Sequence, residues 1–260
     1  MTPAEIVLRR RLLDKGLPSS EWDKFSAAIK NRAFFSANIA SAKFLDEARS
    51  AVADMLQQGG GSRAEAVSRI MQAARQEGLS QDAASLRDPG SVARANVIVS
   101  TNAGMAAGYV KAQLSNTYGA RLAFPAQELV RIEEREKPRN WQVKWQGAGG
   151  RLFSGRMIAL KEDPIWIRIS RFGNPYPPFD FNSGMGVEDV SLDEAVSLGV
   201  IEEGYQPPEA SPIESFNASL EADLQLQDSA VIELLKRTFG DRVKLENGIL
   251  KWIEPALNHD

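Results

Sequence analysis

Apolar residues in the first half of the chain recur at helical spacing. One set lies within residues 38–58 and another beyond the three glycines at 59–61. The sets are Leu45, Ala48, Val52, Met55 and Leu56, then Val67, Ile70, Met71 and Ala74. This spacing places the side chains on one helical face, so it predicts two amphipathic helices separated by a glycine turn. Ser62 and Glu65 stand in capping-box register, which predicts where the second helix begins.

A longer helix is predicted over residues 92–115, with Ser91 as its N-cap. Its interior contains Gly104 and Gly108, and each interior glycine costs about 1 kcal/mol relative to alanine. Small residues four positions apart allow another backbone to approach closely. Thr101 and Asn102 add polar groups to the same stretch. We therefore interpret this segment as a candidate packing or docking helix, either crossing another element in the core or contacting a partner subunit.

The pattern changes after residue 119, where tryptophan, proline and charged residues become frequent. Trp141 and Trp145 are four positions apart and are predicted to share a helical face. The apolar run 165–169 favours a strand. Near the C-terminus, Asp228 is predicted to cap a helix, and Asn247-Gly248 between two short apolar runs predicts a hairpin with a type I′ turn.

These elements indicate an α+β protein with three parts. Residues 1–121 are predicted to form a helical domain, and residues 122–201 a mixed α/β domain. Residues 202–260 are predicted to form an acidic, proline-rich linker followed by a helix and a terminal β-hairpin.

Residues 173–186 stand out because prolines, glycines and aromatic residues alternate there. Pro175, Pro177 and Pro178 fix their own φ angles and hold the preceding residues extended. The aromatic residues Tyr176, Phe179 and Phe181 carry large apolar faces that need to be covered. We expect Tyr176, Pro177, Pro178, Phe179 and Phe181 either to lock a subdomain together or to dock on a partner, and the stiffness of the segment favours the lock.

The composition excludes several kinds of catalytic and metal site. The 260 residues include no cysteine and one histidine, His259, next to the C-terminus. A catalytic Ser-His-Asp triad, a thiolate nucleophile and a Cys- or His-ligated metal site are therefore not expected. We find no phosphate-binding glycine loop and predict no catalytic residue, cofactor or metal. Charged residues interrupt the apolar positions of residues 1–13, so neither a signal peptide nor a membrane span is expected there.

Charge is distributed unevenly along the chain, although the net charge is only -3. Residues 1–125 carry 16 basic and 11 acidic residues, whereas residues 191–260 carry 5 basic and 14 acidic ones. A basic helical half in front of an acidic tail is compatible with sequence-independent binding of DNA by the N-terminal half. Solvated helix faces explain the same pattern without any ligand.

An alternative of a different class comes from three carboxylates close together in sequence. Asp180 lies in the aromatic loop, and Glu188 and Asp189 follow within ten positions. Such a group is compatible with a hard cation and with a metal-dependent hydrolase or nuclease. Capping of a turn by Asp180 and Asn182 accounts for the same residues structurally.

Two stretches of the chain resemble a known family. The first is the helix from Arg94 to Leu114, with Thr101, Asn102 and Gly108. The second runs from Trp141 through Gly155-Arg156, Asp163-Pro164 and Phe172-Gly173 to the aromatic loop as far as Met185. Together they resemble the MuF-like head morphogenesis proteins, the minor head proteins of tailed bacteriophages and prophages, over roughly residues 90–200.

The resemblance implies a minor structural protein of the phage head that has no enzymatic activity. Its expected partners are the portal or inner capsid proteins within a multi-subunit virion assembly, and some members of the wider family also contact packaged DNA. The expected location is the virion head, with the host cytoplasm as the site of assembly. The better known branch of the family carries a cysteine- and histidine-containing motif that this chain lacks.

Overall fold

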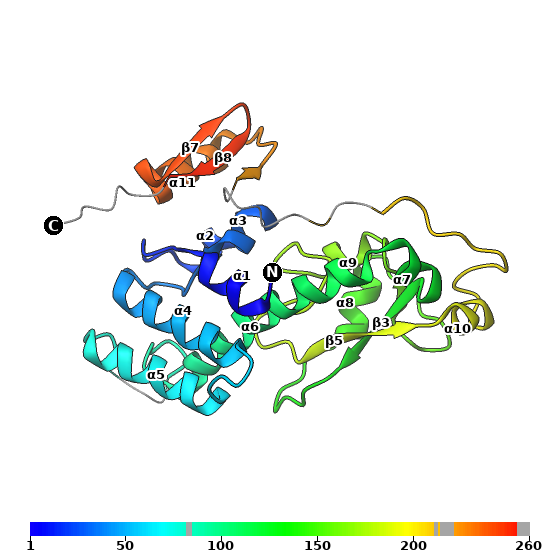
Figure 1. The fold of residues 1–260 in the computed structure, drawn as a ribbon, viewed down its shortest axis with the longest axis horizontal. Coiled ribbons are helices and arrows are strands. Elements are labelled where there is room, and N and C mark those ends of the chain that lie inside the picture. Colours follow the sequence, from blue (N-terminus) through cyan, green and yellow to red (C-terminus); the bar gives the residue numbers. More distant parts are fainter. Residues whose placement is uncertain (82–84, 211–212, 214–220, 254–260) are drawn as a thin grey trace. The chain divides into compact units, whose positions relative to one another are not determined.

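The computed structural model describes residues 1–81, 85–210, 213 and 221–253 and shows an α+β fold (Figure 1). Contacts divide the chain into two compact units. The central unit comprises Met1–Pro3 and Val99–Ile213, and the flanking unit comprises Ala4–Ile98 and Glu214–Asp260. The helical N-terminal half, the mixed second half and the terminal hairpin agree with the predicted fold class.

The flanking unit is mainly helical. Its elements are α1 (Pro3–Arg9), β1 (Arg11–Leu12), α2 (Ser19–Trp22), α3 (Ala27–Arg32), β2 (Ala33–Phe34), α4 (Ala42–Leu56), α5 (Arg63–Gln76), the start of α6 (Val92–Ser115), β6 (Ala222–Asp223), α11 (Ser229–Phe239), the 3-10 helix η1 (Gly240–Arg242), β7 (Val243–Glu246) and β8 (Ile249–Trp252). Helices α4 and α5 lie side by side. The predicted capping box is confirmed, because Ser62 Oγ accepts from the Glu65 amide and the Glu65 carboxylate accepts from the Ser62 amide.

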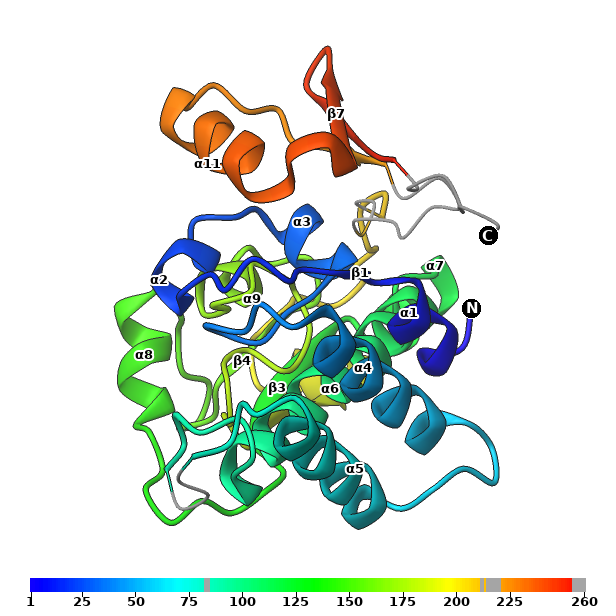
Figure 2. The same ribbon diagram turned by 90° about the vertical axis from the view of Figure 1, so that its left-hand side faces the viewer.

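The C-terminal hairpin is also confirmed (Figures 1 and 2). Asn247 and Gly248 connect β7 to β8 and both have positive φ, 50° and 81°, as a type I′ turn requires. Asp228 caps α11 by accepting from the Ala230 amide at 2.8 Å. This segment packs within the flanking unit rather than alone. Phe239 lies 5.8 Å from Phe25 between ring centroids, and Arg242 forms an ion pair of 2.6 Å with Asp14.

The central unit is built around a small antiparallel sheet. Its elements are the remainder of α6, α7 (Tyr118–Ala123), β3 (Ala126–Arg131), α8 (Trp141–Gly147), β4 (Ile158–Leu160), α9 (Ile165–Arg168), β5 (Met185–Val190) and α10 (Leu192–Ser197). The strand order is β4-β3-β5, with Arg131 opposite Met185 and Ala126 opposite both Val190 and Leu160. As predicted, Trp141 and Trp145 share a buried face of α8, where they join Trp166 in the core.

The prediction of a strand over residues 165–169 is wrong, because this segment forms helix α9. Ile165, Trp166 and Ile169 are buried whereas Ile167 is half exposed, which is the i, i+1, i+4 pattern of a helix. The preceding Asp163-Pro164 explains the outcome. The Asp163 carboxylate accepts from the Ile165 amide at 2.7 Å, so it satisfies one of the free donors of the first turn.

The division by contacts differs from the three parts expected from sequence character. It falls inside α6, after Ile98, and it groups the C-terminal segment with residues 4–98. A change of composition, such as the one after residue 119, therefore does not mark the boundary between the two units. Compact units are decided by which faces pack together. Among the described residues, no helix is long and apolar enough to cross a membrane.

Candidate functional site

The two segments singled out from the sequence meet inside the central unit. The aromatic loop at 176–178 lies directly against the glycines of α6. A Cβ atom added at Gly104 would lie 3.2 Å from Pro178 Cδ. One added at Gly108 would overlap the Pro177 carbonyl oxygen and lie 3.0 Å from the Tyr176 ring. The glycines therefore allow the loop backbone to approach the helix more closely than any other residue would.

The loop aromatics point into the unit. Tyr176 is 4% exposed and packs edge-on against Tyr109 of α6, with ring centroids 6.1 Å apart. Phe179 is fully buried and stacks on Trp166 at 5.9 Å, and Trp166 in turn meets Trp145 at 5.2 Å. Phe181 packs against Phe172 at 4.9 Å. The burial of Tyr176 and Phe179 supports internal packing, rather than docking on a partner, as the role of these two rings, whereas Phe181 is only partly buried.

The loop backbone is shaped to make this contact. The Pro177–Pro178 peptide bond is cis, and Asn182 and Gly184 have positive φ angles of 50° and 66°. The Gly184 carbonyl accepts from the amides of Ile132 and Glu133 at 2.9 and 3.1 Å, which ties the end of the loop to the segment after β3. At Gly184 an added Cβ would overlap the Glu133 carbonyl oxygen, so this turn also requires glycine.

Thr101 and Asn102 lie on α6 in the same unit and are both buried, with 7% and 6% of their surface exposed. The Thr101 hydroxyl has no hydrogen-bond partner among the described residues. Burial of this stretch is compatible with a packing role within the unit.

Asp180 follows the buried Phe179 in the loop, but its carboxylate lies among positively charged side chains. Its carboxylate is 3.1 Å from Arg139, 3.6 Å from Arg171 and 3.8 Å from Lys144. We call these four residues the Asp180 cluster. Burial lowers the pKa of the Lys144 ammonium, Asp180 raises it, and the neighbouring Arg139 and Arg171 lower it further. The sequence singled out Asp180 but gave no indication of these cations, which come from two separate stretches of the chain, the start of α8 and the turn after α9.

The carboxylate alternative finds no geometric support. Asp180 faces the cations described above, and Asp189 forms an ion pair of 2.8 Å with Lys161. Glu188 is exposed on β5. Within the described residues, no three His, Cys, Asp or Glu side chains come together in a group that could hold a metal ion. Asp180 accepts from the Phe181 amide at 2.8 Å, so it also has a local role in the turn.

Three polar side chains, Arg121, Glu162 and Tyr205, link three further segments of the central unit, and the sequence did not indicate this contact. Arg121 on α7 is buried, and its guanidinium lies 3.6 Å from the Glu162 carboxylate without a hydrogen-bond partner among the described residues. The other Glu162 oxygen accepts from the Tyr205 hydroxyl at 2.6 Å. Burial, aided by the hydrogen bond to Glu162, raises the pKa of the Tyr205 phenol. This chain of contacts attaches the segment after α10 to α7 and to the turn that follows β4.

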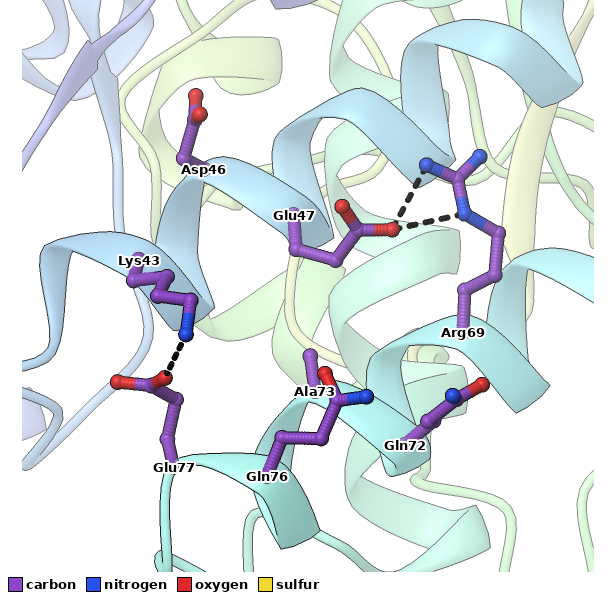
Figure 3. A pocket seen from close by; sticks show the side chains of 8 residues that line it. All are labelled: Lys43, Asp46, Glu47, Arg69, Gln72, Ala73, Gln76 and Glu77. Atoms are coloured by element: carbon purple, nitrogen blue, oxygen red, sulfur yellow. Dashed lines mark hydrogen bonds and ion pairs between the residues drawn. The ribbon is translucent and has the colours of Figure 1, made fainter.

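The flanking unit contains an open polar groove between α4 and α5 with a volume of about 420 Å³ (Figure 3). Ion pairs cross it at two points. Lys43 lies 2.8 Å from Glu77, and Arg69 lies 2.7 Å from Glu47. The hydrogen bond from Lys43, with a second from Ser41, lowers the pKa of Glu77. Because these charges already neutralise one another, the groove presents no charge that calls for a particular ligand.

Comparisons of the chain with protein-family models, curated proteins and solved structures found no match.

Proposed function

We propose that this protein is a minor structural protein of a tailed-phage head, acting in head assembly by association with the portal or the inner capsid. The proposal starts from the resemblance of residues 94–114 and 141–185 to the MuF-like proteins. The observation that supports it best is the contact between α6 and the aromatic loop, because the two stretches that carry the resemblance pack on each other through Gly104 and Gly108.

The proposal gives the contact a structural role. Rings that are buried like Tyr176 and Phe179 hold a scaffold together, and they leave the exposed surface available for partners. The function would then rest on association, with the virion head as the location and the host cytoplasm as the place of assembly. The described residues offer no metal cluster on which the hydrolase or nuclease alternative could be built.

The direct test is co-purification with the portal and major capsid proteins encoded in the same genome. We expect the full-length protein to co-elute with one of them on size exclusion, and its peptides to appear in mass spectra of purified particles. Absence from the particles together with no co-elution would overturn the proposal. A portal gene beside the gene for this chain would strengthen it.

A further inference from the structure

Positive charge in the central unit is concentrated in one stretch of the chain. Residues 135–171 hold nine Lys and Arg but only three Asp and Glu. Within it, Arg139 and Lys144 remain 47% and 36% exposed and share a single carboxylate, Asp180, which also faces Arg171. Arg139 and Lys144 carry two positive charges against this one carboxylate, so this part of the Asp180 cluster can attract a further anion.

The stretch that follows has the opposite character. Between residues 193 and 233 there are ten Asp and Glu and no Lys or Arg. Three of these carboxylates, Glu202, Glu203 and Glu209, are exposed on the central unit. Among the described residues none of the three forms an ion pair. Residues 202–209, here called the acidic stretch, therefore carry unneutralised negative charge.

The acidic stretch is also suited to docking. Pro207 and Pro208 hold part of it extended, so less conformational freedom is lost when it binds. Among the described residues of one copy, Arg139 and Lys144 pair with Asp180 and with no carboxylate of the acidic stretch.

We infer that the Asp180 cluster of one copy binds the acidic stretch of a second copy. The two surfaces are complementary in charge, and both belong to the central unit. They are different patches, so the contact is head-to-tail, and such contacts produce rings when the rotation closes and open chains when it does not. A nucleic acid fits less well. Its backbone needs cations along several nucleotides, whereas this cluster is compact and lies in a unit that also carries the acidic stretch.

The experiment measures self-association of the full-length protein by sedimentation velocity over a concentration series. Association is expected in about 50 mM NaCl and should weaken strongly in about 500 mM NaCl, where exposed charges are screened. The double variant Arg139→Gln/Lys144→Gln should weaken the association roughly tenfold. The triple variant Glu202→Gln/Glu203→Gln/Glu209→Gln should have a similar effect. The control Lys15→Gln/Arg75→Gln removes the same charge from exposed positions of the flanking unit and should change nothing.

Charge reversal makes the test independent of folding defects. Arg139→Glu/Lys144→Glu and Glu202→Lys/Glu203→Lys/Glu209→Lys should each fail to self-associate but should associate when mixed. A protein that stays monomeric in low salt overturns the inference, as does association that neither set of variants weakens. Binding of a DNA duplex that depends on Arg139 and Lys144, without self-association, would assign the cluster to nucleic acid instead. None of these three results bears on co-purification with portal or capsid, so failure here is distinguishable from failure of the proposed function.

Discussion

The central and flanking units each join a helix to a neighbouring segment, but they do so by different physical means. In the central unit, α6 and the aromatic loop meet through glycines and prolines with backbone almost in contact. In the flanking unit, α4 and α5 both have buried apolar faces, and exposed ion pairs such as Arg69 with Glu47 bridge the two helices along an open groove. A close-packed contact depends on shape and tolerates no added atom, whereas an exposed ion pair is screened by water and tolerates substitution. Substitutions should therefore affect the two contacts very unequally.

The largest effect is expected for Phe179→Ala. Phe179 belongs to the aromatic loop and is fully buried, with its ring stacked on Trp166. Truncation to alanine leaves a cavity in the core and should reduce the free energy of unfolding by about 3–5 kcal/mol. Phe124→Ala is the matched control, because Phe124 is 42% exposed and should cost less than about 1 kcal/mol. Urea denaturation of both variants checks this, and equal losses would contradict the packing described.

Gly108→Ala should have the next largest effect. The added methyl group would overlap the Pro177 carbonyl oxygen, so the loop has to move away from α6 at an expected cost of about 1–3 kcal/mol. Gly147→Ala on α8 is the control, since an added Cβ there meets nothing within 4 Å. The control should be neutral or stabilising by up to about 1 kcal/mol, and a thermal melt that ranks the two variants in the opposite order would refute the close contact.

Tyr205→Phe should cost about 1 kcal/mol near neutral pH, because it removes the hydrogen bond to Glu162. The pKa of Tyr205 is raised in the folded protein, so the folded state holds this proton more firmly than the unfolded state. The stabilisation is therefore complete below about pH 10 and is lost as the pH rises further. We expect the difference in unfolding free energy between wild type and variant to be constant at lower pH and to shrink in alkali. A difference that grows there would exclude this role for the phenol.

The smallest effect is expected in the α4–α5 groove. Arg69→Gln removes ion pairs with Glu47 and Asp54, but the arginine side chain is 38% exposed, so the loss should stay below about 1 kcal/mol. The loss should vanish in high salt, which denaturation with and without added NaCl would show. A large loss of unfolding free energy that does not depend on salt would mean that the α4–α5 contact is as sensitive to substitution as the contact between α6 and the aromatic loop.

Local features of the fold were predictable because their causes lie within a few residues. The Ser62–Glu65 capping box, the Asp228 cap and the Asn247-Gly248 turn each satisfy their own backbone groups and were identified correctly. The α9 prediction failed because an apolar run of five residues fits a strand and a buried helix equally well.

Contacts between distant segments were not predictable in the same way. The unusual residues of α6 and of the aromatic loop were each recognisable, but nothing local indicates that Gly108 faces Pro177. Likewise Arg121, Glu162 and Tyr205 look like ordinary surface residues in the sequence, and only the fold brings their side chains together. The cations around Asp180 were hidden for the same reason.

The position of the division within α6 has a consequence for the order in which the chain folds during synthesis. The flanking unit begins at Ala4, is interrupted after Ile98 and is completed only by residues beyond Ile213. At about 5–20 residues per second, roughly 6 to 23 seconds pass between the emergence of its two parts from the ribosome. The central unit, almost continuous in sequence, can finish folding first. Until Phe239 emerges, Phe25 lacks one of the rings that pack on it, and an incompletely folded nascent chain exposes apolar surface to chaperones and to aggregation.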